Sequence, residues 1–143
     1  MNAALSDAAV VVRRTIAAPP DVLFDAWLDP IALATWMRPG GVDSTVATVD
    51  ARVGGRYEVV MRLDSGGVPH TGEYRVIDRP KRLVFTWMSP FTDNRETLVT
   101  VDFVRRGNRT EIVVTHERLP QRELTSHTNG WTSALENLAL PYA

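Results

Sequence analysis

The stretch LPQRELTSHTNGWTSALENLALPY, from Leu119 to Tyr142, decides the fold of this chain. Its apolar and semi-polar positions recur in steps of three, four and one. On a period of about 3.6 residues they form one continuous stripe: Leu124, His127, Trp131, Ala134, Leu135 and Leu138. The stripe predicts a single amphipathic helix over the whole stretch. Such a helix needs an apolar surface to cover, so the preceding sequence must supply one.

In the sequence before this helix, the spacing of the apolar residues changes twice. Residues 10–16 are rich in β-branched side chains and predict a first strand. Residues 17–28 and 31–37 predict two short helices, the first with prolines in its opening turn, where a missing N–H has no partner to lose. Apolar side chains then alternate, which predicts strands at 44–51, 55–63, 70–78, 82–88, 97–105 and 109–117. The short turns between the later strands favour antiparallel neighbours.

The alternation also predicts which strand residues face the helix. The predicted inner face carries Tyr57, Val59, Met61, Gly72, Tyr74, Val76, Leu83, Phe85, Trp87, Val99, Val101, Phe103, Ile112, Val114 and His116, and the outer face carries Thr86 and the charged residues. Closing the hairpins at their turns pairs Tyr74 with Phe85, Val76 with Leu83, Gly72 with Trp87, Trp87 with Thr97, Thr97 with His116, Val101 with Ile112, and Glu58 with Arg75.

These elements predict an α+β fold. A curved antiparallel sheet of six or seven strands wraps around the long C-terminal helix, and two short helices follow the first strand. The register places His70, Trp87 and His116 toward one end of the inner face, and His127 should return to the same end. We therefore expect a cavity between helix and sheet that is polar at this end and apolar at the other. A glycine in a helix interior costs about 1 kcal/mol relative to alanine, so we expect a strand or a tryptophan ring to approach Gly130 closely.

The composition fits one domain over residues 1–143, with residues 1–9 as a flexible N-terminus. Sixteen basic and seventeen acidic residues leave a net charge of −1, which gives no electrostatic reason to bind nucleic acid. Residues 1–9 lack the pattern of a signal peptide, and no apolar run approaches about 18 residues, so we expect no membrane insertion and a cytoplasmic location. The absence of cysteine excludes disulfides and thiolate chemistry.

Five segments resemble a known family. They are AAPPDVLFDAW (17–27), VGGRY (53–57), GEYRVI (72–77), RLVFTW (82–87) and the terminal pattern His127-x-x-Gly130-Trp131-x-x-x-Leu135-x-x-Leu138. Together they resemble the START-like (SRPBCC) superfamily. Within it they resemble the branch named after the C-terminal domain of the activator of the ninety-kilodalton heat-shock protein ATPase. The resemblance covers about residues 10–140 and implies a helix-grip fold with a hydrophobic cavity. Relatives of this kind bind lipids, hormones or polyketides, a few catalyse cyclisation or hydrolysis, and one branch contacts a chaperone.

The leading hypothesis is a non-enzymatic module that binds a small apolar or amphipathic molecule in this cavity. The candidate ligand-binding residues are Trp36, Tyr57, Met61, Tyr74, Phe85, Trp87, Thr97, His116, His127, Trp131 and Leu135. The aromatic members of this set are equally compatible with a packed core. One alternative is a cyclase- or hydrolase-like enzyme with His116 or His127 as general base. Another is a protein-interaction domain, chaperone-associated or homodimeric.

Other chemistry lacks a sequence pattern. No His-x-x-x-His pair supports a zinc site built from the three histidines, so we expect no metal and no cofactor. The chain has no Gly-x-Ser-x-Gly elbow, no Gly-x-Gly-x-x-Gly and no P-loop. The arginines around the turn at Gly107 are expected only to keep that end of the sheet solvated.

Overall fold

A computed structural model describes residues 9–143 of the chain. In them, seven antiparallel strands form one sheet in the order β1-β7-β6-β5-β4-β3-β2. The strands are β1 (Ala9–Ile16), β2 (Ser44–Val49), β3 (Arg56–Leu63), β4 (Gly66–Asp78), β5 (Arg82–Trp87), β6 (Thr97–Arg106) and β7 (Arg109–Glu117). The helices are α1 (Pro20–Leu28), α2 (Pro30–Trp36) and α3 (Leu124–Ala139), with short 3-10 helices η2 (Pro90–Thr92), η3 (Gln121–Glu123) and η4 (Leu140–Tyr142).

The predicted fold class is confirmed: two short helices follow β1, and a long C-terminal helix packs on an antiparallel sheet. We expected a flexible N-terminus at residues 1–9. Residues 1–8 of this segment lie outside the described residues, and Ala9 begins β1. None of the helices within residues 9–143 combines the length and the apolar character needed to span a bilayer.

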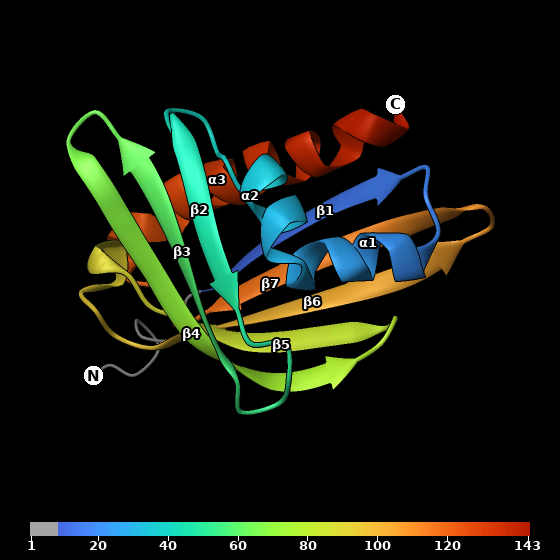
Figure 1. The fold of residues 1–143 in the computed structure, drawn as a ribbon, viewed down its shortest axis with the longest axis horizontal. Helices are drawn as coiled ribbons and strands as arrows, with labels where there is room; N and C mark the ends of the chain where they lie inside the picture. Colours follow the sequence, from blue (N-terminus) through green and yellow to red (C-terminus); the bar gives the residue numbers. More distant parts are fainter. Residues whose placement is uncertain (1–8) are drawn as a thin grey trace.

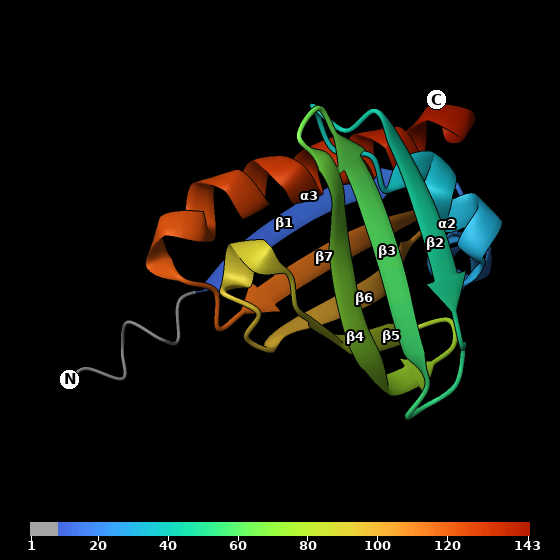
Figure 2. The same cartoon turned by 60° about the vertical axis from the view of Figure 1, so that its left-hand side comes forward.

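The sheet is strongly curved, and the helices share its inner face. In Figure 2, β2, β3 and β4 run steeply across α3, whereas β1 runs alongside it. Figure 1 shows α2 beside β2 and α1 over β6, and α2 also contacts α3. Trp27 of α1 joins these layers, because its ring lies 6.2 Å from Phe103 of β6, 4.6 Å from Trp36 of α2 and 6.0 Å from Trp131 of α3. The hydrophobic core therefore sits between the three helices and the sheet.

Prolines and an aspartate set the helix ends. Pro20 opens α1, and Asp29 caps α2 by accepting a hydrogen bond from Ile31 N at 3.0 Å. The predicted helix over residues 119–142 is shorter in the structure, since α3 is regular only from Leu124 to Ala139. Pro141 lacks an N–H and disfavours α-helical geometry in the residue before it, so the chain continues as the tighter turn η4.

A β-bulge corrects one predicted pairing. Tyr74 lies opposite Phe85, as expected, but the register shifts between Tyr74 and Val76. Val76 therefore lies opposite Val84, and Ile77 takes the predicted place opposite Leu83. The extra residue turns Val76 outward, where it is 39% exposed, so Val76 does not belong to the inner face.

The hairpin of β6 and β7 is shifted by two residues from the prediction. Trp87 pairs with Thr97 as expected, but Val99, not Thr97, lies opposite His116, and Phe103, not Val101, lies opposite Ile112. The tight turn at Gly107 and Asn108 closes directly on the Arg106–Arg109 pair, one residue later on β6 than we assumed. A shift of two keeps every side chain on its predicted face, so the assignment of faces survives.

Two statements about the outer face are also wrong. Glu58 lies opposite Thr71 instead of Arg75, which approaches Glu73 and Glu96. Thr86 is buried and does not face water. Its hydroxyl accepts a hydrogen bond from Glu73 N, and its carbonyl accepts one from the Tyr57 hydroxyl.

The missing side chain of Gly72 leaves room for the hydrogen bond between Tyr57 and Thr86. An added Cβ would collide with the carbonyl oxygen of Thr86 and with the Tyr57 ring. The ring that lies against Gly72 is thus that of Tyr57, its partner on β3.

Candidate functional site

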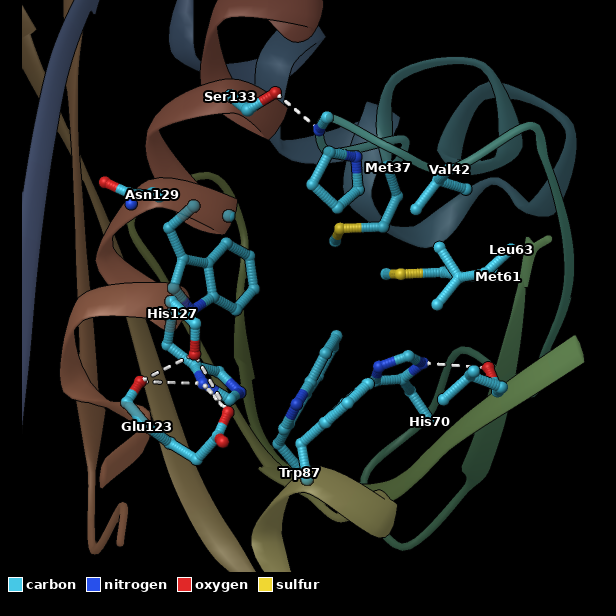
Figure 3. A pocket seen from close by; sticks show the side chains of 17 residues that line it. Met37, Val42, Met61, Leu63, His70, Trp87, Glu123, His127, Asn129 and Ser133 are labelled. Atoms are coloured by element: carbon cyan, nitrogen blue, oxygen red, sulfur yellow. Dashed lines mark hydrogen bonds and ion pairs between the residues drawn. The ribbon is translucent and has the colours of Figure 1, made fainter. Parts of the chain in front are cut away.

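A cavity of about 540 Å³ lies between the first half of α3, the loop after α2 and the inner face of β3 and β4 (Figure 3). This volume falls in the range of sites for small molecules, about 300–1,000 Å³. The lining residues are Met37, Pro39, Gly40, Val42, Met61, Leu63, Val68, His70, Trp87, Phe91, Glu123, Ser126, His127, Asn129, Gly130, Trp131 and Ser133. The side chains of Met37, Val42, Met61 and Leu63 gather on one side, opposite His127.

The loop after α2 is tied to α3 and forms one wall. Gly40 N donates to the hydroxyl of Ser133 at 3.0 Å. The amide of Asn137 donates to the carbonyl of Arg38 at 2.8 Å, and the hydroxyl of Thr45 donates to the carbonyl of Met37 at 2.8 Å. The first two bonds join the loop to α3, and the third joins it to β2.

His116 is enclosed behind this cavity by a complete hydrogen-bond chain. Trp131 Nε1 donates to His116 Nδ1 at 3.0 Å, so this nitrogen is the acceptor. Thr97 donates its hydroxyl proton to the carbonyl of Trp87 at 2.6 Å, so His116 Nε2, 2.7 Å away, carries the single N–H proton of the ring and donates it to the Thr97 oxygen. Burial lowers the pKa of His116 to about 3, so the ring is neutral near pH 7. With both nitrogens occupied, His116 has no free base position.

His127, unlike His116, keeps one ring nitrogen without a hydrogen-bond partner among residues 9–143. Its Nδ1 lies 3.0 Å from the carbonyl oxygen of Glu123 and 3.3 Å from the carboxylate of the same residue, so Nδ1 carries the proton. Ser126 donates to the Glu123 carboxylate at 2.9 Å. Burial lowers the pKa of His127 against the opposing effect of Glu123. The remaining nitrogen, Nε2, has no hydrogen-bond partner among residues 9–143 and is an acceptor on a cavity wall.

His70 has the same arrangement on the opposite wall. Its Nδ1 lies 3.3 Å from the carbonyl oxygen of Val59 and 3.1 Å from that of Val68, which makes this nitrogen a donor. Burial lowers the pKa of His70 to about 4, so the ring is neutral and Nε2 is left as an acceptor without a partner in the described part of the chain.

Trp87 stands between these two histidines (Figure 3). Its ring lies 4.9 Å from His70, 6.1 Å from His116 and 5.4 Å from Trp131, while the rings of His116 and His127 are 5.2 Å apart. The three histidines therefore gather at one end, on two sides of the tryptophan. Within residues 9–143, no three His, Asp or Glu side chains are arranged to hold a metal ion. Trp87 Nε1 is buried without a hydrogen-bond partner in the same range.

The structure separates the candidate site residues into three groups. Met61, Trp87, His127 and Trp131 line the cavity. Tyr57, Tyr74 and Phe85, together with Trp87, surround a second void of only about 20 Å³ deeper in the core. Trp36, Thr97, His116 and Leu135 line neither: Trp36 donates to the carbonyl of Ala26, Leu135 is fully buried, and Thr97 and His116 belong to the hydrogen-bond chain described above.

Sequence reasoning missed most of the wall that α3 and the loop contribute. Ser126, Asn129, Gly130 and Ser133 line the cavity, and their spacing of three, one and three forms a stripe of small residues beside the apolar one. This stripe is the sequence feature from which that wall of the cavity could have been predicted. The expected close approach to Gly130 is absent, because an added Cβ would meet only Pro39 Cβ, at 4.0 Å. Gly130 leaves open space beside the helix.

Comparison with known proteins adds a family and a set of similar folds. The family model described as Activator of Hsp90 ATPase homolog 1-like protein matches residues 17–140. A crystal structure of a protein from Chromobacterium violaceum is 24% identical, with a TM-score of 0.83, over 94% of this chain and 96% of that one. An HSP90 activator from Plasmodium falciparum is 26% identical, with a TM-score of 0.74, over 93% and 94%. No curated protein matches the sequence.

Proposed function

The chain belongs to the family of Activator of Hsp90 ATPase homolog 1-like proteins, and from this premise we propose that it binds a small apolar or amphipathic molecule in the cavity between α3 and the sheet. The observation that carries the proposal is the cavity of about 540 Å³, with apolar walls and a few polar groups at one end. This combination is typical of small-molecule sites, in which apolar contacts supply affinity and a few polar groups fix orientation.

Binding is tested with a neutral fluorescent probe, N-phenyl-1-naphthylamine, and with native mass spectrometry of freshly purified protein to find a co-purifying molecule. The matched variants are Gly130→Leu and Thr132→Leu. Gly130 borders the cavity and an added side chain has room to enter it, whereas Thr132 lies exposed on the same helix. We expect Gly130→Leu to abolish probe binding and Thr132→Leu to retain it. Equal binding by both variants, or no binding by the wild type, contradicts the proposal.

One observation favours a second candidate, an enzyme with His127 as general base. The ring is held through Nδ1 by Glu123, and its free Nε2 lies at the cavity, which is the arrangement that proton abstraction requires. Hydrolysis of p-nitrophenyl esters of graded acyl length, by the wild type and by His127→Gln, tests it. A rate lost in the variant with probe binding intact supports catalysis, and equal rates exclude it. The enclosed His116 is not a candidate base.

The interaction hypothesis is supported by the name of the family and by the similarity to an HSP90 activator from Plasmodium falciparum. Chaperone association and a homodimer stay predictions for this chain. Light scattering during size-exclusion chromatography measures the second directly.

A further inference from the structure

Resting on the proposed function, we propose that the cavity selects apolar molecules whose polar end is a hydroxyl or an amine, and rejects carboxylates and other anions. The inference concerns the chemistry of the head group, which the cavity's polar end defines through charge and through the direction of its hydrogen bonds.

The charge of the lining comes first. The seventeen lining residues include one carboxylate, Glu123, and no lysine or arginine. Three arginines adjoin the lining in sequence. Arg38 donates to the carbonyl of Asp43, and Arg122 pairs with Asp93 at 2.6 Å. Arg62 is exposed and alternates on β3 with the lining residues Met61 and Leu63, so its side chain leaves the opposite face of the strand. An anion in the cavity would thus lose its hydration, meet no cation and lie near a like charge, whereas a buried anion requires a paired cation to be tolerated.

The direction of the hydrogen bonds comes second. His70 and His127 both donate their Nδ1 protons to carbonyl oxygens of the protein, so the Nε2 of each ring is a hydrogen-bond acceptor. Both rings have lowered pKa values, which keeps this acceptor available near neutral pH. Glu123 adds further acceptor oxygen on the side of His127. Because these groups accept, the ligand has to donate.

The head groups follow from these acceptors. Trp87 lies between the two histidines, and its Nε1–H is buried away from the cavity, so it offers no bond to a ligand there. A hydroxyl donates to a histidine, and an amine donates to a histidine and to Glu123. A carboxylate accepts only, so it leaves both ring acceptors unpaired, which buried polar groups tolerate poorly.

The test compares ligands that share one ring system and differ only in the head group: naphthalene, 2-naphthol, 2-(aminomethyl)naphthalene and 2-naphthoate. Each displaces N-phenyl-1-naphthylamine from the wild-type protein at pH 7. We expect 2-naphthol and the amine to bind at least tenfold more tightly than 2-naphthoate, and 2-naphthol to bind more tightly than naphthalene.

Two variants test whether the preference for 2-naphthol over 2-naphthoate depends on the charge of Glu123. Glu123→Gln keeps the acceptor oxygen for Ser126 and removes the charge, so we expect the preference for 2-naphthol over 2-naphthoate to shrink severalfold. Glu136→Gln makes the same change of net charge at an exposed position of α3 and should leave the preference unchanged.

The outcomes separate this inference from the proposed function. If neither the probe nor any naphthalene binds, the proposed function fails and the inference fails with it. If all four ligands bind but 2-naphthoate equals or exceeds 2-naphthol, or naphthalene equals 2-naphthol, the cavity binds apolar molecules without this selection and only the inference is overturned.

Discussion

Replacement of Gly130 by alanine should make the protein more stable, although the glycine lies in the middle of its longest helix. Alanine is favoured over glycine in a helix interior by about 1 kcal/mol. The new methyl group meets no atom closer than Pro39 Cβ at 4.0 Å, so no steric cost offsets the gain. We therefore expect the free energy of unfolding to rise by about 1 kcal/mol and Tm to rise by about 3 °C. Urea denaturation followed by tryptophan fluorescence measures the change, with an unchanged m-value as the sign of two-state unfolding.

Gly72 supplies the matched contrast. Alanine at this position would place a methyl group into the Thr86 carbonyl and the Tyr57 ring, and neither can yield without breaking their hydrogen bond to each other. Overpacking of this kind costs about 1–3 kcal/mol, and the backbone contact puts Gly72→Ala at the upper end. A loss of stability in Gly130→Ala, or no loss in Gly72→Ala, would refute the distinction between a glycine that leaves space and a glycine that permits contact.

Further predictions concern the enclosed histidines. Thr97→Val should cost about 1–3 kcal/mol in chemical denaturation, because it leaves the buried Nε2–H of His116 without a partner and removes the hydroxyl's bond to the carbonyl of Trp87, whereas Thr97→Ser should cost less than half as much. The folded-state pKa values of His70, about 4, and His116, about 3, lie below the unfolded value of about 6.5, so the unfolded state binds more protons and stability is lost as pH falls from about 6.5 toward 3. At pH 5 this amounts to about 2 kcal/mol for each histidine relative to neutral pH, and imidazole resonances of His70 or His116 that titrate near pH 6.5 in the folded protein would contradict it.

The local pattern of the sequence was sufficient for the fold. Alternation assigned Phe85, Val101 and Val114 to the inner face, and all three are buried. This assignment survived a two-residue error in the pairing of β6 with β7, because side chains repeat their direction every second residue. It failed at Val76, where a bulge inserts one residue and reverses the direction. A bulge depends on contacts between strands, so local alternation does not reveal it.

The site was predicted less completely. The sequence placed Trp87, His127 and Trp131 in one cavity, since each follows from a face and an end of its element. It grouped His116 with them as a ligand contact, but the structure gives both of its nitrogens to Thr97 and Trp131. It also gave no role to the loop from Met37 to Val42, which has no periodicity to read.

The sequence by itself thus determined the order of elements, their faces and the stripe of α3, because periodicity is a property of neighbouring residues. Only the tertiary structure decided which histidines keep a ring nitrogen free for a ligand. It also decided whether another residue packs against Gly130 or leaves open space beside it. Those outcomes depend on hydrogen bonds and distances between segments far apart in the chain, such as the bond from Gly40 to Ser133 that joins the loop after α2 to α3. Residue spacing determines the direction of a side chain, and its partners are determined by packing.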